Sequence, residues 1–453
     1  MQKFKDILHL SAPLMAAQMA QSLMLIEDTI LFGLAGVDTL AGAGLGAGLY
    51  HFLFIVLGGL YLTVTYQTAA SVGRQQQEKL GGLVRAGLLM GAVISLVVAL
   101  AIYTLPSRLG LGRLDPTVLE PASHYWEGAV WITFPAIGFM VMRGLAAGFA
   151  LTGFIMRISI GVAIINLPLS YLLMQGWGPV PAMGVYGVAI GTALMMALAC
   201  LGLGAALWRQ PAVRNVLVQA WQTRCAPSDY KPYVTLGIPI MLAHAMEGGL
   251  FTLVTVLAGT LGSVALAAHT IALQTASLSF NIYIGIAQGH AIRVGQAFGA
   301  ERWQDAKAYA GRGLILGACC SLIALVIFVS FPVQIITLFS LGATPVSMDA
   351  LLSVGVDILF IAALFQAVDG AQVIAMSSLR ALHLGMVPTW ITVVSYWAIA
   401  FPVALYWMES YGLKGLWSGL GVGLGCAALT LIALFQWKIH QLAGATGAGN
   451  QGH

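Results

Sequence analysis

Charged residues are scarce in this sequence. Asp, Glu, Lys and Arg together make up 8% of its 453 residues, whereas hydrophobic residues make up 59%. Charged residues account for about a quarter of an ordinary soluble domain. A chain with so little charge and a mean hydropathy of +0.89 is not a soluble domain, and we predict an all-α membrane protein that crosses the bilayer many times.

Several motifs are also absent, and each absence excludes a class of site. The five cysteines are odd in number and show no CxxC spacing, so neither a disulfide framework nor a zinc site is indicated. The sequence has no HExxH or GxSxG motif, which disfavours an intramembrane enzyme. The basic residues lie mainly in loops, so the net charge of +4 gives no indication of nucleic acid binding. We expect no nucleic acid partner. We expect no cofactor.

The hydrophobic residues are grouped into runs of membrane length. A helix needs about 20 apolar residues to cross the bilayer core. Runs of this length predict twelve spans, at residues 7–34, 44–72, 82–105, 122–151, 158–175, 184–208, 233–260, 266–293, 306–331, 347–377, 384–408 and 415–440.

The basic residues predict the orientation of these spans. Lys and Arg favour the cytoplasmic side of a membrane protein. With a cytoplasmic N-terminus, sixteen of the 20 basic residues fall on the inside, while Arg108, Arg113 and Lys414 fall outside and Arg143 lies within a span. We therefore expect a multi-pass protein of the bacterial inner membrane with both termini in the cytoplasm.

The second half of the sequence repeats the first at an offset of about 226 residues. The clearest match pairs residues 10–15, LSAPLM, with residues 236–241, LGIPIM. Six spans per half is an even number, so the halves insert in the same sense and are related by an axis along the membrane normal. We predict an N-lobe at 1–208, a cytoplasmic linker at 209–232, a C-lobe at 233–441 and a flexible tail at 442–453.

Glu247 stands near the middle of a predicted span. A carboxylate costs a few kcal/mol or more at such a depth, so it usually has a partner, an ion or a proton. The alternative is a glutamate that only packs helices together. His244 precedes Glu247 by one turn and either responds to pH or donates a hydrogen bond as a neutral side chain.

Asp369 is the second intramembrane carboxylate of the predicted C-lobe, and its depth could match that of Glu247. Two close carboxylates bind a hard cation or share protons. Gln366 and Gln372 lie three residues before and after Asp369, on its helix face, where they could supply further oxygens. Asp357 is nearer the outside and is a weaker candidate, which could instead hydrogen-bond a neighbour.

The predicted N-lobe has its own carboxylates at non-equivalent positions. Glu27 and Asp28 are adjacent and point about 100° apart on a helix, so we expect only one of them to face the interior. Asn166 and Ser170, on the span interrupted by Pro168, could hydrogen-bond Asp28. Asn166 could equally serve helix packing.

Other buried side chains have less specific interpretations. Aromatic and Met residues, among them Tyr283, Phe365 and Tyr396, line an adaptable cavity, face lipid or fill the space between helices. Arg143 either pairs with a nearby acid or extends to the surface.

These residues resemble those of the multidrug and toxin extrusion (MATE) transporters, with the NorM branch most similar. The resemblance covers nearly the whole chain and is carried by Pro13 with Asp28-Thr29, NLPL at 166–169, Glu247 after Pro239, RVGQAFGA at 293–300, DGAQ at 369–372 and SLR at 378–380. It implies two six-helix bundles that export organic cations in exchange for Na⁺ or H⁺. It also implies that Glu247 and Asp369 form a C-lobe cation site, and that Asp28 and Asn166 belong to an N-lobe proton or drug site.

Two positions depart from the pattern of the family. Ser170 stands where NorM members often have a second Asn. Phe365 stands one turn before Asp369, where some sodium-coupled members have Tyr, so one oxygen ligand is missing.

The sequence thus favours a monomeric antiporter that exports cationic hydrophobic molecules through the lipid bilayer. The alternative is a flippase for lipid-linked glycans from the same broad superfamily. An anionic pyrophosphate would require several basic residues within the spans, where only Arg143 qualifies.

Overall fold

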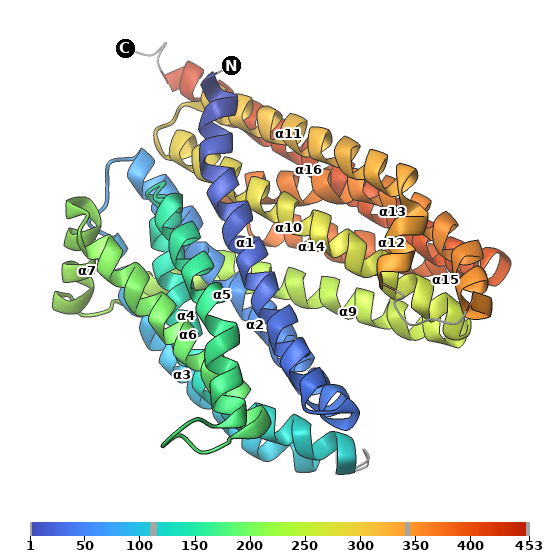
Figure 1. Cartoon of the computed structure of the whole chain (residues 1–453). Coiled ribbons are helices and arrows are strands. Elements are labelled where there is room, and N and C mark those ends of the chain that lie inside the picture. Colours follow the sequence, from blue (N-terminus) through green and yellow to red (C-terminus); the bar gives the residue numbers. More distant parts are fainter. Residues whose placement is uncertain (1, 109–115, 340–344, 450–453) are drawn as a thin grey trace. The chain divides into compact units, whose positions relative to one another are not determined.

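The structure is a computed structural model that describes residues 2–108, 116–339 and 345–449. Helices linked by short turns make up the fold (Figure 1). The described residues form no β-strand beyond an isolated bridge between Trp177 and Val180. The all-α prediction is confirmed.

The chain divides into two compact units. Unit 2 runs from Ala16 to Met241, and unit 1 combines the residues up to Met15 with those from Leu242 onward. Most of α1 (Gln2–Leu34) belongs to unit 2. The other helices of unit 2 are α2 (Val37–Gly73), α3 (Leu80–Arg108), α4 (Pro116–Gly148), α5 (Thr152–Gln175), α6 (Gly184–Trp208), α7 (Pro211–Gln222), α8 (Pro227–Pro232) and the π-helical η2 (Tyr233–Gly237).

The longer segment of unit 1 begins within α9 (Ile238–Thr260). Its other helices are α10 (Ser263–Gly299), α11 (Trp303–Ser330), α12 (Pro332–Phe339), α13 (Pro345–Ala381), α14 (Met386–Val394), the π-helical η3 (Ser395–Ala400), α15 (Phe401–Tyr411) and α16 (Leu413–Gly449).

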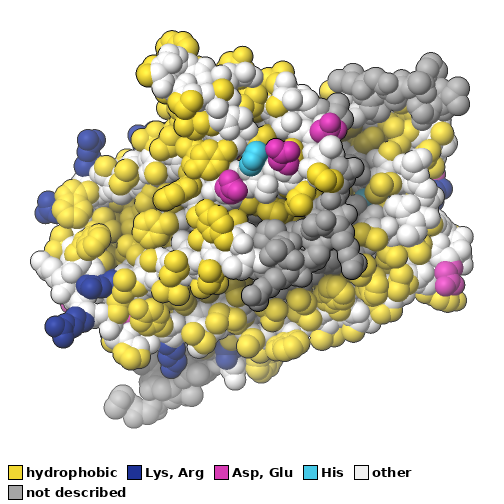
Figure 2. Space-filling view, turned by 90° about the horizontal axis from the view of Figure 1, so that it is seen from below, with side chains coloured by type: hydrophobic (Ala, Val, Ile, Leu, Met, Phe, Trp, Pro, Cys, Tyr) yellow, Lys and Arg dark blue, Asp and Glu magenta, His cyan; other side chains and the backbone are white. Residues whose placement is uncertain are grey.

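Eleven of the twelve predicted spans are found as helical segments long and apolar enough to cross a membrane, within the described part of the chain. The twelfth is α1, whose 33 residues extend about 50 Å at 1.5 Å per residue but include Glu27 and Asp28. Large apolar side chains such as Leu96 and Leu429 are 71% and 72% exposed. Hydrophobic side chains are spread widely over the face in Figure 2, among other side chains and backbone atoms.

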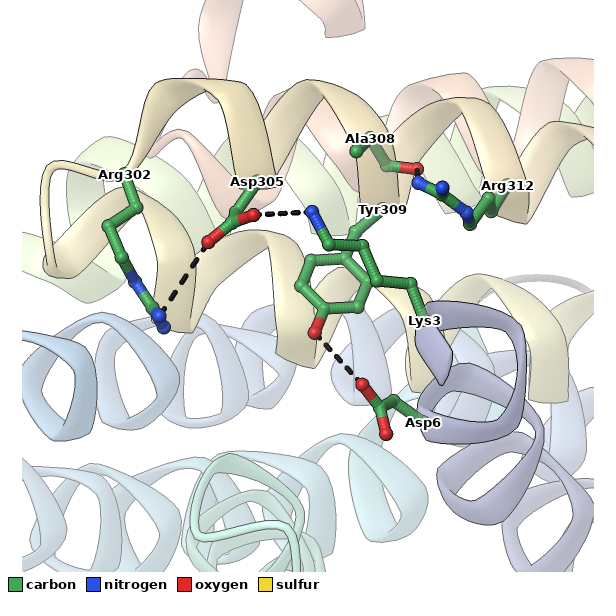
Figure 3. Close-up of polar contacts among 7 residues, drawn as sticks. All are labelled: Lys3, Asp6, Arg302, Asp305, Ala308, Tyr309 and Arg312. Carbon is green, nitrogen blue, oxygen red and sulfur yellow. Dashed lines mark hydrogen bonds and ion pairs between the residues drawn. The ribbon is translucent and has the colours of Figure 1, made fainter. Parts of the chain in front are cut away.

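The first 15 residues pack with the second half of the sequence. Lys3 forms an ion pair with Asp305 of α11, and the Tyr309 hydroxyl donates to Asp6 Oδ2 at 3.1 Å (Figure 3). Arg302 approaches the other Asp305 oxygen at 3.6 Å. Ion pairs near a surface contribute only about 0–1 kcal/mol each. These contacts therefore contribute little to the free energy of unfolding and mainly orient the start of α1.

Close helix packing gives this segment its place in unit 1. Ser11 lies so near Gly289 of α10 that a β-carbon built on Gly289 would be 2.7 Å from the Ser11 backbone nitrogen. One turn earlier on α10, a β-carbon on Gly285 would be 2.8 Å from the Met15 nitrogen. Small residues permit such approach between helices in lipid.

The start of the second half packs with unit 2 in turn. The Tyr233 hydroxyl donates to the Leu83 carbonyl of α3 at 3.0 Å. A β-carbon on Gly237 would lie 2.8 Å from the Leu60 carbonyl oxygen of α2. The compact units thus differ from the predicted lobes 1–208 and 233–441, because packing assigns residues 1–15 and 233–241 to the opposite units.

Two segments that were expected to lie outside the helical spans also contain helix. Residues 209–232, expected to be a linker, contain the helices α7 and α8, and Arg85 of α3 donates to the Thr223 carbonyl that follows α7 at 2.6 Å. Within the predicted flexible tail at 442–453, α16 continues to Gly449. Residues 450–453 lie outside the described residues.

The glycine contact between α1 and α10 gives a first prediction. Gly289→Ala should lower the thermal unfolding midpoint of the detergent-purified protein, because the added methyl collides with Ser11; overpacking of this kind costs about 1–3 kcal/mol. Gly311→Ala in α11 is the matched control, since a β-carbon there meets nothing within 4 Å. It should leave the midpoint unchanged or raise it, and equal losses in both variants would contradict the packing assigned to Ser11.

Candidate functional site

Glu247 of α9 and Asp369 of α13 lie within the same unit. Asp369 is only 5% exposed, whereas Glu247 is partly exposed. The two carboxyl groups interact electrostatically. The structure therefore brings together the two acids that the sequence singled out for a C-lobe site.

A tyrosine hydroxyl lies within hydrogen-bonding distance of Glu247, one member of this pair. Tyr396, in the π-helical η3, has its hydroxyl 3.1 Å from Gln372 Oε1 and 3.5 Å from Glu247 Oε1. Tyr396 is completely buried. Sequence reasoning treated it only as one of many aromatic residues, since nothing in the surrounding apolar run distinguishes its hydroxyl from one that packs against lipid.

The two glutamines that flank Asp369 behave differently. Gln372 contacts Tyr396 and so belongs to the group around Glu247. Gln366 is fully buried and donates from Nε2 to the Ala276 carbonyl at 3.0 Å. Its Oε1 has no hydrogen-bond partner among the described residues. Gln366 therefore links α13 to α10 rather than to Glu247.

Two further predicted residues have separate surroundings. Asp357 forms an ion pair with Lys414 at 2.6 Å, and the two side chains are 49% and 53% exposed. It therefore satisfies its charge at the surface and lies outside the group around Glu247. His244 is partly buried one turn before Glu247 on α9. Arg380 of α13, not predicted as a site residue, is buried and interacts electrostatically with Glu247.

Unit 2 contains a second pair of acids. Asn166 of α5 donates from Nδ2 to Glu27 Oε2 at 3.1 Å and to Asp28 Oδ1 at 3.4 Å. Both acids are buried, at 6% and 3% exposure, so the expectation that only one of them faces the interior is wrong. One amide placed between adjacent residues of α1 reaches both carboxylates. Ser170 does not share this role, and its hydroxyl has no partner in the described part of the chain.

Asp28 also borders a cavity of about 80 Å³. Thr192 of α6 lines this cavity and donates to Asp28 Oδ2 at 3.2 Å. A single water needs about 10–15 Å³ by this measure, so the cavity holds several waters or part of a larger molecule. The other lining residues are mainly apolar or aromatic and include Tyr50, His51, Phe54, Tyr125 and Met196.

Arg143 of α4 lies beside the same cavity. It donates to Gln21 Oε1 and to Gln18 Oε1, both at 2.9 Å, and Gln21 lines the cavity. The internal repeat equates Gln21 with Glu247 and Arg143 with Asp369. The equivalent positions thus interact in both units, through a guanidinium and an amide in unit 2 and through two carboxyl groups in unit 1.

The acids do not form a conventional metal centre. No group of three or more His, Cys, Asp or Glu side chains that could hold a metal ion occurs among the described residues. Glu247, Asp369, Tyr396 and Gln372 instead offer two carboxylates and neutral oxygens. Sets of oxygen ligands suit a hard cation or a proton.

Comparison with known proteins identifies the family. The MatE family model matches residues 13–172 and 239–406, one stretch in each half of the repeat. The chain belongs to the MatE family. The predicted resemblance is confirmed.

One relative and two solved structures illustrate the extent of the similarity. The chain is 32% identical over 442 residues to the "Probable multidrug resistance protein NorM" of Pseudomonas aeruginosa, covering 97% of this chain and 90% of that protein. A crystal structure of a MATE protein in complex with MaL6 matches with a TM-score of 0.88 at 19% identity, covering 98% and 97% of the two chains. A transporter of the MOP superfamily from Pyrococcus furiosus, described as having a binding pocket of reverse polarity, matches with a TM-score of 0.84 at 19% identity, covering 97% of each chain. The twelve-helix, two-bundle fold of the MATE transporters is thus also the fold of this chain.

The contacts of Asn166 give a second prediction. Asn166→Leu should lower the unfolding midpoint at pH 8, because it removes hydrogen bonds to buried carboxylates that are worth about 1.5–3 kcal/mol each. The deficit should be smaller at pH 5 than at pH 8, because a carboxyl group that gains a proton needs the donor less. The midpoint of purified protein is measured at both values of pH.

Ser170→Ala, one turn further along α5, is the control and should change the midpoint little at either pH. A deficit in Asn166→Leu that does not depend on pH would mean that the amide only packs α5 against its neighbours.

Proposed function

We propose that the protein is a multidrug efflux antiporter that exports cationic amphipathic molecules in exchange for Na⁺ or H⁺. The observation that carries the proposal is the interaction of Glu247 and Asp369 inside one helical unit of a MatE family membrane protein. Two carboxyl groups held together in a nonpolar environment favour the uptake of positive charge. Such a pair gains and loses an ion more readily than it stays ionised and empty.

The cavity in unit 2 supports an organic cation as the exported molecule. Asp28 supplies a negative charge, and aromatic rings such as Tyr50 and Tyr125 border the same space. Cations are attracted to the faces of aromatic rings. Met24 and Met196 add adaptable side chains of the kind used by proteins that bind varied ligands. The name of the Pseudomonas aeruginosa relative, a multidrug resistance protein, agrees with this substrate class.

Exchange follows from competition for negative charge between the ion and the drug. An ion that enters from outside binds the carboxylate pair and changes the relative stability of outward-open and inward-open states. A ligand shifts such an equilibrium only through its different affinity for the two states. Export therefore requires that ion binding at Glu247 and Asp369 disfavours the state that holds the drug.

The distribution of basic residues supports the expected orientation. Sixteen of the 20 Lys and Arg fall on one side of the predicted spans, and the cytoplasmic side is the one that such residues favour. We therefore place both termini in the cytoplasm of a bacterial cell, with the protein in the inner membrane. A monomer suffices, since the two bundles contain both sites.

A flippase for lipid-linked glycans is the second candidate, because the fold alone does not decide whether the binding pocket suits a cationic or an anionic molecule. The Pyrococcus furiosus neighbour shares the fold and is described as having a pocket of reverse polarity. An anionic headgroup would need basic side chains directed at it. Arg143 is already hydrogen-bonded to Gln18 and Gln21, and Asp28 lines the cavity beside it. These contacts favour a cationic cargo.

The carboxylates give a third prediction. Glu247→Gln and Asp369→Asn should each reduce ion-driven ethidium transport to the background of vesicles that lack the protein, because neither variant has two ionisable groups. Expression and folding are followed by fluorescence-detected gel filtration. Asp357→Asn is the control, since Asp357 is paired with Lys414 at the surface, and should retain transport within about two-fold. Normal transport in both site variants would refute the coupling role.

The coupling ion is identified in everted vesicles, whose lumen corresponds to the outside of the cell. Vesicles are loaded with Na⁺ at equal pH, or with acidic buffer without Na⁺, and ethidium uptake is recorded on dilution. We expect uptake with at least one of the two gradients. The absence of uptake with either gradient would contradict antiport.

A further inference from the structure

Tyr396 occupies an unusual position in unit 1. It belongs to η3, a π-helical segment from Ser395 to Ala400 that separates α14 from α15. Single π-helical turns are rare and are frequently found at functional sites. Tyr396 is fully buried, and its hydroxyl reaches two acceptors on two other helices, Glu247 on α9 and Gln372 on α13.

The hydroxyl has one proton for these two oxygens. A phenol donates one hydrogen bond and accepts through its lone pairs. Gln372 Oε1 is the nearer oxygen, at 3.1 Å, and Glu247 Oε1 the farther, at 3.5 Å. When the proton is directed to Gln372, a lone pair of the Tyr396 oxygen is left on the side of Glu247.

That lone pair suits either coupling ion. A protonated Glu247 can donate its own hydrogen to the Tyr396 oxygen, and a cation beside Glu247 can take the same oxygen as a ligand. When Glu247 is ionised and empty, the phenol proton turns to the carboxylate. A rotated Gln372 amide then donates from Nε2 to the phenol oxygen. The phenol therefore donates one hydrogen bond and accepts another, or a cation, in both arrangements.

We propose that Tyr396 is a positioning residue of the coupling site, which accommodates a proton or a cation at Glu247 by reversing its hydrogen bonds with Gln372. The proposal rests on the proposed antiport function and names a residue of the same site. It also supplies an oxygen that the family resemblance left missing. Phe365 has no hydroxyl, and its ring packs against Trp417 with the centroids 5.6 Å apart, so the phenol oxygen comes from η3 instead.

The charged surroundings fit this role. Glu247 and Asp369 both interact electrostatically with Tyr396, and Arg380 interacts with Glu247. On α10, Tyr283 interacts with Asp369. His244, one turn before Glu247 on α9, is the remaining titratable group near the carboxylate in the sequence. The Tyr396 hydroxyl lies within hydrogen-bonding reach of Glu247 and can both donate and accept.

The test compares Tyr396→Phe with the wild type in the vesicle assay, over a series of Na⁺ concentrations and lumenal pH values. For Na⁺, we expect the half-saturating concentration to rise about five- to ten-fold, because one oxygen ligand is lost from the cation-bound state. For a proton, the midpoint should move to higher pH, because the ionised carboxylate loses the hydrogen bond that the phenol donates to it. The rate at saturating ion should stay within about two-fold, since both carboxylates remain.

Tyr233→Phe is the matched control. Tyr233 is also a buried tyrosine of a π-helical segment, η2, and its hydroxyl donates to the Leu83 carbonyl. This variant loses a buried hydrogen bond of similar kind without touching the carboxylates. It should leave the half-saturating concentration unchanged.

A second variant tests the other end of the hydrogen-bonded pair. Gln372→Leu should raise the half-saturating concentration in the same direction, and adding it to Tyr396→Phe should have less than the additive effect, as expected for residues that act together. An unchanged ion dependence in Tyr396→Phe, or an equal change in Tyr233→Phe, would overturn the assignment. Wild-type vesicles that respond to neither ion would instead contradict the proposed function and leave no ion dependence to compare.

Discussion

The free energy of a carboxylate in a nonpolar environment governs the rest of this structure. Placing one near the middle of a span costs about 2.5–3.5 kcal/mol or more, and each unit compensates differently. In unit 2, Asn166 and Thr192 donate directly to Asp28. In unit 1, Glu247 has a long contact from Tyr396 and the field of Arg380. The two units thus place different groups around their intramembrane carboxylates.

The internal repeat makes this contrast sharper. At equivalent positions, unit 2 has Arg143 bonded to Gln21, and unit 1 has Asp369 beside Glu247. A covalently attached guanidinium supplies a permanent positive charge in unit 2. Unit 1 has two carboxyl groups at the corresponding place, and Arg380 interacts electrostatically with one of them, Glu247. The equivalent positions of the repeat thus differ in the sign of the charge that they carry.

The sequence was sufficient for features that follow from local energetics. The spans were predictable from the length of the apolar runs. The two C-lobe acids stood out because a charged side chain within a membrane span is costly and therefore rare. Asp357 was expected to lie nearer the outside, with a neighbour as its alternative partner, and it pairs with Lys414 at the surface. Tyr396 and the crossing of residues 1–15 into unit 1 depend on helix register and on contacts such as Ser11 with Gly289, which apolar patterns do not encode.

The crossings also connect the ion site to the rest of the chain through the backbone. The chain enters unit 1 between Met241 and Leu242, about one and a half helical turns before Glu247. On the other side of the crossing, Tyr233 and Gly237 are held against α3 and α2. The backbone that leads into Glu247 therefore comes directly from helical turns that are packed in unit 2.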